Sequence, residues 1–370
     1  MSLFRLLPVV FMTPVMIYFF FFIRRMVRFW FHPRWKWWHT VLIITVCFGL
    51  GYVSSNMFTS GIVVVMHLFV LCLATDLLHL ILRKIRKLRW WSGLYSSGML
   101  PIAITIAVLV FAHWNIQHVV ETRYTIETDK QIRSEGYHIA FISDLHAGLT
   151  LNSEDLQKYA KQIAEQRPDM VILGGDIVDE GTTLECMQLT FRVLGSIPSE
   201  FGTFYVYGNH DRSNYWGECD YTTQQLDEAM REANVKVLSD EVVQLTDDLI
   251  LIGREDASFG GNRDRASSVK LLMAVQQEDF LLMLDHQPLE LSINRDLGVD
   301  LQLSGHTHAG QIWPIGWFSE YLEINELTYG HHEMEGFHAI VSSGMAGWGY
   351  PFRTSGRSEY VTIDIQRRES

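Results

Sequence analysis

The sequence predicts two parts, an N-terminal bundle of about four transmembrane helices and one soluble α/β domain. Charge is divided unevenly along the 370 residues, because eleven of the 30 Lys and Arg but only one of the 42 Asp and Glu precede Glu121. The remaining 19 basic and 41 acidic residues give the second part a formal charge of −22. From about Gln131 onward, apolar runs alternate with amphipathic segments, which is typical of βαβ units and a largely parallel sheet.

Four apolar stretches in the first part approach the roughly 20 residues that a membrane-spanning helix needs. They are Leu6–Ile23, Thr40–Phe58, Ile62–Leu82 and Ser92–His113. The first contains two prolines and is the least secure span, but no small-residue cleavage site follows it, so an anchor is favoured over a signal peptide. We therefore expect a transmembrane anchor over residues 1–113, a juxtamembrane linker over 114–136 and a soluble domain over 137–370.

The basic residues of the anchor predict its orientation. They gather in two groups, Arg24, Arg25, Arg28, Arg34 and Lys36, then Arg83, Lys84, Arg86, Lys87 and Arg89, whereas the loop Tyr52–Ser60 has no charge. Basic loops stay on the cytoplasmic side, which requires the last span to exit outward. The sequence therefore predicts an integral protein of the cell (inner) membrane whose soluble domain, residues 137–370, is extracytoplasmic.

Two ionisable residues, Asp76 and His79, lie three positions apart in the third apolar stretch. Ionisable groups within a membrane span are often functional. No other charged residue of the predicted spans pairs with them, so a structural polar contact between helices is the favoured interpretation. No catalytic role is assigned to either residue.

The soluble part is predicted as alternating strands and helices, with a second sheet after about Val235. Expected strands are His138–Ser143, Met170–Leu173, Thr203–Tyr207, Leu249–Ile252, Phe280–Leu284, Leu301–Leu303, His338–Val341 and Tyr360–Ile365. Expected helices are Ser153–Gln166, Thr182–Leu194, Thr222–Glu232 and Pro288–Arg295. The first of these helices carries acidic residues in its first turn, as a helix N-terminus prefers.

Side chains that can bind metals stand directly after several of these strands. They are Asp144, His146, Asp176, Asn209, His210, Asp211, His286, His306 and His308. Sites in open α/β sheets form beyond the carboxyl ends of the strands, so we expect these residues to meet at one edge. Glycines precede several of them, including Gly175, Gly208 and Gly305, and glycine permits sharp turns and a close approach of the backbone.

The residue types predict a site for two divalent ions. Three carboxylates, one amide and four or more imidazoles exceed what one tetrahedral ion needs, and this mixture suits Mn, Fe, Zn or similar metals. Two metals about 4 Å apart lower the pKa of a bridging water and stabilise in-line displacement at phosphorus. An isolated Asp-x-His is weak evidence because it is more often structural, whereas Gly305-His306-Thr307-His308 is stronger evidence because its two imidazoles beside glycine have little packing reason to be there. The combination, in this order and after apolar strands, favours phosphoester hydrolysis.

These motifs resemble the calcineurin-like metallophosphoesterase superfamily over roughly residues 137–366. The run Gly305–Gln311, with Ser343–Gly347 further along, is similar to the membrane-associated bacterial branch, although Ala309 stands where that branch often has glycine. The resemblance implies a β-sandwich flanked by helices.

The resemblance also implies a role for each site residue. One metal would be held by Asp144, His146, Asp176 and His308, and the second by Asp176, Asn209, His286 and His306. Asp176 would bridge the two ions, and a hydroxide between them would attack the phosphorus in line. His210 would protonate the leaving oxygen or stabilise charge on the phosphoryl group, with its imidazole oriented by Asp211. The full ligand set is present, which favours an enzyme.

Three polar residues outside the motifs receive structural interpretations. His331 and His332 are expected in a loop before the strand at His338, as surface or packing residues. Arg353 is a weaker candidate for phosphate contact, and a surface ion pair is the favoured interpretation.

Several substrate hypotheses stay open. The charge of −22 disfavours nucleic acid. The short linker and the apolar segment Ile312–Phe318 favour a lipid-linked phosphoester, with core packing of that segment as the alternative. A phosphodiester is a further substrate hypothesis, and the preference between monoester and diester stays open. Other hypotheses are a nucleotide-lipid pyrophosphate hydrolase and a non-catalytic membrane sensor or scaffold that binds metal. The membrane is the expected partner, and no oligomeric state is predicted.

Overall fold

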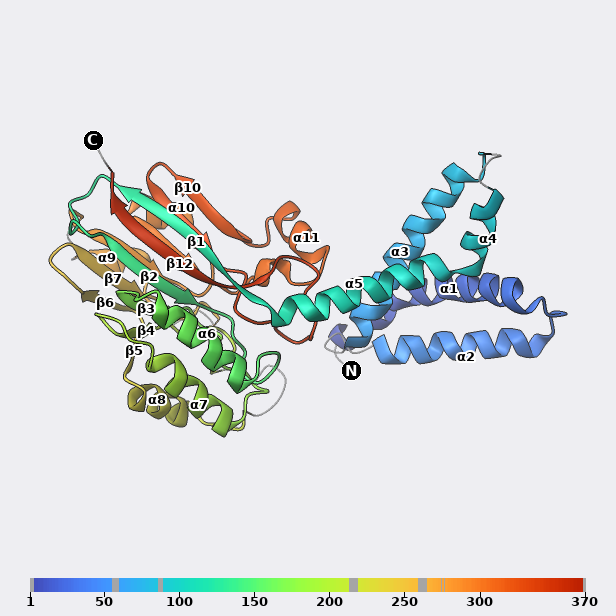
Figure 1. The fold of residues 1–370 in the computed structure, drawn as a ribbon, viewed down its shortest axis with the longest axis horizontal. Coiled ribbons are helices and arrows are strands. Elements are labelled where there is room, and N and C mark those ends of the chain that lie inside the picture. The colour runs from blue at the N-terminus through green and yellow to red at the C-terminus, as the bar shows by residue number, and fades with distance from the viewer. Residues whose placement is uncertain are drawn as a thin grey trace. The chain divides into compact units, whose positions relative to one another are not determined.

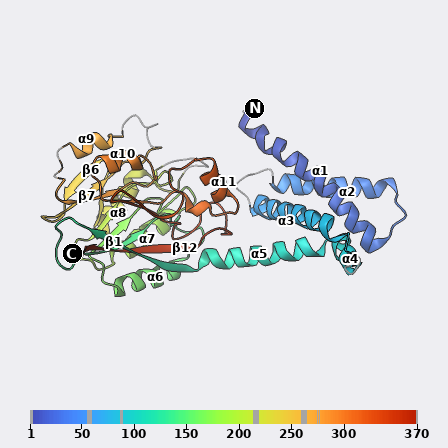
Figure 2. The ribbon, with the colours of Figure 1, turned by 90° about the horizontal axis from the view of Figure 1, so that it is seen from above.

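The computed structural model describes residues 3–54, 60–85, 89–212, 219–258, 265–273, 275 and 277–368. The chain divides into two compact units, Met1–His113 and Trp114–Ser370. Figure 1 draws the first unit, which is helical, in blue to cyan, and the second unit, which holds the strands, mainly in green to red. Figure 2 shows the same elements from above.

The first unit consists of α1 (Leu3–Phe31), α2 (Trp37–Ser54), α3 (Ser60–Leu82), α4 (Arg89–Ser97) and most of α5 (Met99–Gln117). Among the described residues, α3 and α5 are long and apolar enough to cross a membrane, and the apolar part of α2 is shorter. A bundle of four spanning helices therefore stays a prediction.

Two details of the predicted spans are corrected by the structure. The stretch Ser92–His113 is not one helix, because α4 ends at Ser97 and α5 begins at Met99, after Gly98 with a φ of +68°. Glycine adopts this left-handed conformation without a Cβ penalty, so the chain can turn there. The first basic group is not confined to a loop either, since Arg24, Arg25 and Arg28 lie within α1.

Asp76 of α3 makes a polar contact with α1. Its carboxylate accepts hydrogen bonds from Tyr18 Oη at 2.6 Å and from Arg25 Nη1 at 2.9 Å. His79 stacks on Tyr95, with 3.6 Å between ring centroids. The contact supports the structural interpretation of Asp76. Its charged partner was missed because Arg25 lies beyond the predicted end of the first span.

The first sheet of the second unit has the strand order β1-β12-β2-β3-β4-β5. Its strands are β1 (Val119–Thr128), β2 (Tyr137–Ile142), β3 (Met170–Leu173), β4 (Thr203–Tyr205), β5 (Val235–Val237) and β12 (Ser358–Arg367). The strands β2 to β5 are parallel, and β12 is antiparallel to β2 and parallel to β1. The helices α6 (Ser153–Glu165), α7 (Leu184–Gly195) and α8 (Thr223–Glu232) cover its outer face through a buried apolar cluster that includes Ile163, Phe191 and Leu226.

The second sheet has the order β10-β11-β9-β8-β7-β6. Its strands are β6 (Glu241–Gln244), β7 (Leu249–Gly253), β8 (Phe280–Leu284), β9 (Leu301–Ser304), β10 (Gly330–Met334) and β11 (Phe337–Val341). The four inner strands are parallel and both edges are antiparallel. A cluster that includes Phe141, Phe204, Leu282 and Leu303 joins the two sheets. The helices α9 (Ser268–Leu272) and α10 (Leu291–Asp296) cover the other face, and α11 (Ile315–Tyr321) follows β9. The predicted two-sheet α/β fold with flanking helices is confirmed.

Four strands escaped prediction, namely β1, β5, β6 and β10. Strand β1 lies within the segment 114–136 that was expected to be a linker, and it pairs with β12 along ten residues. His331 and His332 lie in β10 and not in a loop, opposite Ile340 and Ala339 of β11. Both β1 and β10 are edge strands. Edge strands carry many polar side chains, so they lack the apolar runs by which the inner strands were recognised.

Candidate metal centre

The predicted ligand residues follow the carboxyl ends of parallel strands from both sheets. Asp144 and His146 follow β2, Asp176 follows β3, and Asn209 follows β4. From the second sheet, His286 follows β8, and His306 and His308 follow β9. Because the sheets pack face to face, these strand ends meet, and the structure brings the seven side chains together.

One group consists of Asp144, His146 and His308, all buried. Their ligand atoms lie within 4.8 Å of one another. The Nε2 atoms of His146 and His308 are 3.2 Å apart, and His308 Nε2 is 3.4 Å from Asp144 Oδ1. Three donor atoms therefore surround one point, where a cation could be held.

A second group consists of Asp176, His286 and His306, whose ligand atoms also lie within 4.8 Å of one another. His286 Nε2 is 3.2 Å from Asp176 Oδ2, and His306 Nδ1 is 2.8 Å from Asn209 Oδ1. Asp176 Oδ2 is also 3.9 Å from His146 Nε2 of the first group. The carboxylate of Asp176 thus faces both groups.

The pKa values of His308, His306 and Asp176 are shifted toward the forms that bind metals, whereas those of His286 and Asp144 are raised. Burial, together with the neighbouring His146, holds the pKa of His308 well below its ordinary value. Burial and the neighbouring His286 lower the pKa of His306 to about 4. Although burial favours a neutral acid, His286 holds the pKa of Asp176 well below its usual range. Neutral imidazoles and an ionised carboxylate are the forms that bind metals.

Groups behind the ligands hold two of the imidazoles in place. His146 Nδ1 is 3.2 Å from Asp179 Oδ2, and His286 Nδ1 is 2.8 Å from the carbonyl oxygen of Gly174. Such partners fix the orientation of a ligating ring and raise its basicity. Asp179 was missed by the sequence analysis because no motif distinguishes it from other acids that follow a strand.

The backbone at the ligands is unusual for residues other than glycine. Five of the ligands have positive φ: Asp144 (51°), His146 (42°), Asp176 (51°), His306 (70°) and His308 (51°). Each residue in a sparsely populated region costs of order 1–3 kcal/mol, and such residues cluster at functional sites. Hydrogen bonds from the amides of Asp144 and His146 to the carbonyls of Gly175 and Asp176 hold this conformation.

Two glycines permit the close approach that the sequence predicts. A Cβ on Gly208 would lie 2.2 Å from Asp176 Oδ1, and a Cβ on Gly305 would lie 2.2 Å from Asp144 Oδ2. Real Cβ atoms do not approach so closely, so any side chain at these positions would displace a carboxylate from the site.

The carboxylate beside the His210 ring is Glu180 and not Asp211, which corrects the predicted role of Asp211. His210 Nδ1 is 3.1 Å from Glu180 Oε2. Burial lowers the pKa of His210, but the hydrogen bond to Glu180 and the charge of Asp176 outweigh it and raise this pKa above its ordinary value. The buried Asp211 carboxylate instead accepts hydrogen bonds from backbone amides of Asp176, Ile177, Val178 and Gly208. Asp211 was predicted as the partner of His210 because the two are neighbours in the chain. The actual partner, Glu180, comes from the turn after β3.

Glu180→Gln is therefore expected to affect mainly catalysis, and Asp211→Ala mainly stability. Glu180→Gln should lower kcat for an ester with a poor leaving group by about 10-fold, since general acid catalysis contributes about 10²–10⁴-fold and the imidazole remains. Asp211→Ala should chiefly lower Tm, because each buried donor left without a partner costs about 1–3 kcal/mol. Steady-state kinetics and thermal unfolding of both variants check this. A lower Tm for Glu180→Gln than for Asp211→Ala would contradict the assignment.

Arg353 is fully buried, so the surface ion pair expected from the sequence is wrong. Its Nη1 donates to the carbonyl oxygen of His308 at 3.1 Å, and its Nη2 donates to that of Ala346 at 2.6 Å. Burial lowers the pKa of its guanidinium to about 10. Arg353 thus holds the turn that carries His308 and makes no surface contact.

Replacing Arg353 by Leu should destabilise the second unit. Hydrogen bonds to charged groups contribute about 1.5–3 kcal/mol each, and two carbonyls would lose their donor. Thermal unfolding should show a lower Tm, and Arg353→Lys should recover part of the loss. An unchanged Tm for Arg353→Leu would contradict this role.

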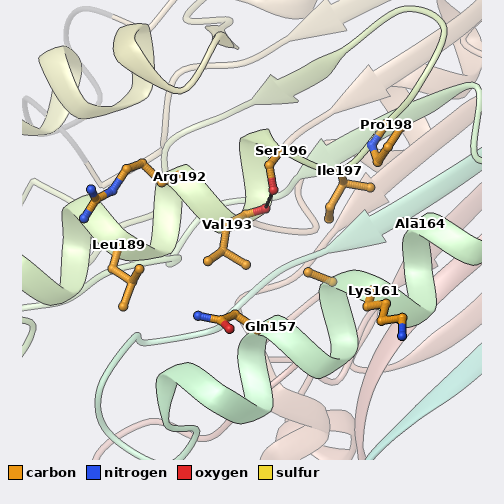
Figure 3. A pocket seen from close by; sticks show the side chains of 10 residues that line it. Gln157, Lys161, Ala164, Leu189, Arg192, Val193, Ser196, Ile197 and Pro198 are labelled. Carbon is orange, nitrogen blue, oxygen red and sulfur yellow. Dashed lines mark hydrogen bonds between the residues drawn. The ribbon is translucent and has the colours of Figure 1, made fainter.

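A separate groove of about 520 Å³ lies between α6 and α7. Figure 3 shows its lining, which includes Gln157, Lys161, Leu189, Arg192 and Val193, and a hydrogen bond from Ser196 Oγ to the carbonyl oxygen of Val193. None of its lining residues belongs to the two ligand groups. The groove is therefore distinct from the candidate metal centre.

Comparison with known proteins gives a family for the second unit. Residues 137–310 match the family described as calcineurin-like phosphoesterase. A metallophosphoesterase of Aquifex aeolicus is 29% identical over 268 residues, which cover 70% of this chain and 98% of that protein. A metallophosphoesterase of Helicobacter pylori is 32% identical over 65% of this chain, and the match spans 62% of that protein's length.

A vertebrate relative is also similar. A protein of Danio rerio described as a transmembrane protein with a metallophosphoesterase domain is 25% identical over 75% of this chain and 64% of its own length. The matched family segment contains all six residues of the two ligand groups and also Asn209. Residues 137–310 therefore form a calcineurin-like phosphoesterase domain, and the protein is a metal-dependent phosphoesterase.

Proposed function

We propose that the site holds two divalent cations and hydrolyses a phosphoester, and the carrying observation is that Asp176 faces both ligand groups. Asp144, His146, Asp176 and His308 would hold one cation. Asp176, Asn209, His286 and His306 would hold the other. Two such ions lower the pKa of water between them and neutralise charge on the phosphoryl group for in-line displacement.

The side chains of the protein would position the reaction and move its proton. The raised pKa of His210 keeps its imidazole protonated over a wider pH range, with Glu180 as its partner. A protonated imidazole at this place can donate to the leaving oxygen or stabilise the phosphoryl group. The backbone amide of His210 donates to Asp176 Oδ1 at 2.7 Å, which couples the acid to the shared carboxylate.

The activity test uses chromogenic substrates. The full-length protein in detergent is stripped of metal by chelation and assayed with a p-nitrophenyl phosphodiester and a monoester, before and after Mn²⁺ is restored. Metal-dependent turnover supports the proposal, and the two rates rank the ester types. Absence of turnover of these esters and of a lipid-linked phosphodiester, with two metals bound per chain, would overturn it.

We further propose that α3 and α5 anchor the protein in the cell membrane, with the catalytic unit on the extracytoplasmic side. The support is the length and apolarity of both helices and the basic residues before α5. A C-terminal alkaline phosphatase fusion should be active in cells, and a matched cytoplasmic reporter should not. The opposite result would overturn this orientation and favour the nucleotide-lipid pyrophosphate hydrolase, whose substrate is made in the cytoplasm.

A further inference from the structure

The segment that follows the metal-ligating His308 exposes a concentrated apolar surface. Seven large apolar side chains lie between 47% and 73% exposed within twelve residues: Trp313, Ile315, Trp317, Phe318, Tyr321, Leu322 and Ile324. Six other large apolar side chains are exposed among the described residues of the second unit, and they are scattered over four elements and loops. Core packing, the alternative interpretation of Ile312–Phe318, holds for Ile312 and fails for its exposed neighbours.

This apolar surface begins directly after the metal-ligating turn. The 3-10 turn of His308–Gly310 leads into it, and the backbone of α11 packs on that turn so closely that a Cβ on Gly310 would lie 2.2 Å from Gly316 Cα. The segment returns at Thr328, whose carbonyl oxygen accepts a hydrogen bond from Thr307 Oγ1 at 2.5 Å. Thr307 lies between two ligands, so both ends of the segment are tied to the ligand turn.

The apolar surface also connects to the proposed acid. The ring centroids of His210 and Trp348 lie 5.3 Å apart. The side chain of Gln311 accepts a hydrogen bond from the Trp348 amide at 2.9 Å and donates to its carbonyl oxygen at 3.0 Å. Gln311 directly precedes Ile312, so the exposed apolar side chains begin at the rim of the site.

The first residues of the second unit also contact this edge of the site. The Asn115 side chain donates to the carbonyl oxygens of Arg353 and Gly356, at 3.1 and 2.9 Å. Thr354, between them, accepts a hydrogen bond from the Trp313 amide at 2.8 Å. The loop of residues 353–356 therefore contacts both Asn115, near the end of α5, and Trp313, the first exposed residue of the apolar surface. Helix α5 is long and apolar enough to span a membrane.

The amino-acid composition of this surface favours contact with a lipid interface over contact with an anionic partner. Residues 313–324 contain two tryptophans, one tyrosine and no Lys or Arg, and their charged residues are Glu320 and Glu323. Tryptophan and tyrosine prefer the boundary between hydrocarbon and headgroups. Because these two acids would be repelled by anionic headgroups, electrostatic attraction cannot drive binding of this surface to a membrane. Burial of its apolar side chains would have to supply the binding energy.

We propose that residues 313–324 insert into the interfacial layer of the bilayer and that the metal centre takes the phosphoester headgroup of a lipid from that bilayer. This inference rests on the proposed hydrolase function and names its substrate class. Insertion at the rim would place a lipid headgroup at the metal centre while its acyl chains stay in the membrane.

The test compares two substrates with the same leaving group. Full-length protein is placed in nanodiscs of zwitterionic lipid that contain a diacylglycerol p-nitrophenyl phosphodiester, and a water-soluble methyl p-nitrophenyl phosphodiester is assayed in parallel. The double variant Trp317→Glu/Phe318→Glu should lower turnover of the lipid ester by at least about 10-fold, since charged side chains are expelled from the interface. Turnover of the soluble ester should stay within about twofold, because neither residue is a metal ligand.

Two controls keep the result interpretable. The variant Val269→Glu/Met273→Glu places the same charges on exposed apolar positions of α9 and its end, and it should leave both rates unchanged. A second insertion variant, Tyr321→Glu/Leu322→Glu, should repeat the selective loss if the first fails to fold. Equal loss of both activities in folded protein, or loss of neither, would overturn the inference. Wild-type turnover of the soluble ester without the lipid ester would also overturn it, whereas failure on both esters would count against the proposed hydrolase function.

Discussion

Asp176→Asn is expected to lower turnover of a p-nitrophenyl phosphodiester by about 10³-fold or more, which corresponds to about 4 kcal/mol of transition-state stabilisation. The reason is its position, with Oδ2 3.2 Å from His286 Nε2 and 3.9 Å from His146 Nε2. An amide in place of this carboxylate removes one negative charge from both ligand groups at once. Metal content measured by elemental analysis should fall from about two ions per chain to about one or none.

A matched control separates this effect from a general loss of charge. Asp247 is exposed, and Asp247→Asn removes the same charge from the same unit. It should keep both metal content and turnover. Full turnover by Asp176→Asn with two ions retained would refute the shared role of this carboxylate.

His210→Gln is expected to lower kcat for an alkyl phosphodiester by about 10²-fold, because general acid catalysis contributes about 10²–10⁴-fold. The loss should be only a few-fold for a p-nitrophenyl ester, since this leaving group departs without a proton. The His210 ring is hydrogen-bonded to Glu180 and is not one of the metal-ligating side chains of the two ligand groups. Metal content should therefore not change. Rates for both esters and elemental analysis check these expectations.

The control for His210 is His332→Gln, which replaces an exposed imidazole of β10 and should leave both rates intact. An equal loss on both esters would assign His210 to stabilisation of the phosphoryl charge. An unchanged rate on both esters would exclude it from the reaction.

Much of the second unit could be predicted because its inner strands are apolar on both faces. Strands such as Met170–Leu173 and Phe280–Leu284 coincide with β3 and β8. Edge strands were missed, because their alternating polar side chains resemble a loop or linker. The ligand residues were recognisable because strand ends in a parallel arrangement share one side, and glycines before several of them mark crowded turns.

The sequence by itself determined the division of charge, the apolar stretches, the inner strands and the set of metal-binding residue types in their order along the chain. All of these are local or periodic properties. Only the tertiary structure decided that Glu180, and not Asp211, contacts His210, and that Arg353 is buried behind His308. It also decided that the apolar side chains after Ile312 are exposed. These outcomes depend on which distant segments pack together, and that packing is set by the whole core and not by neighbours in the chain.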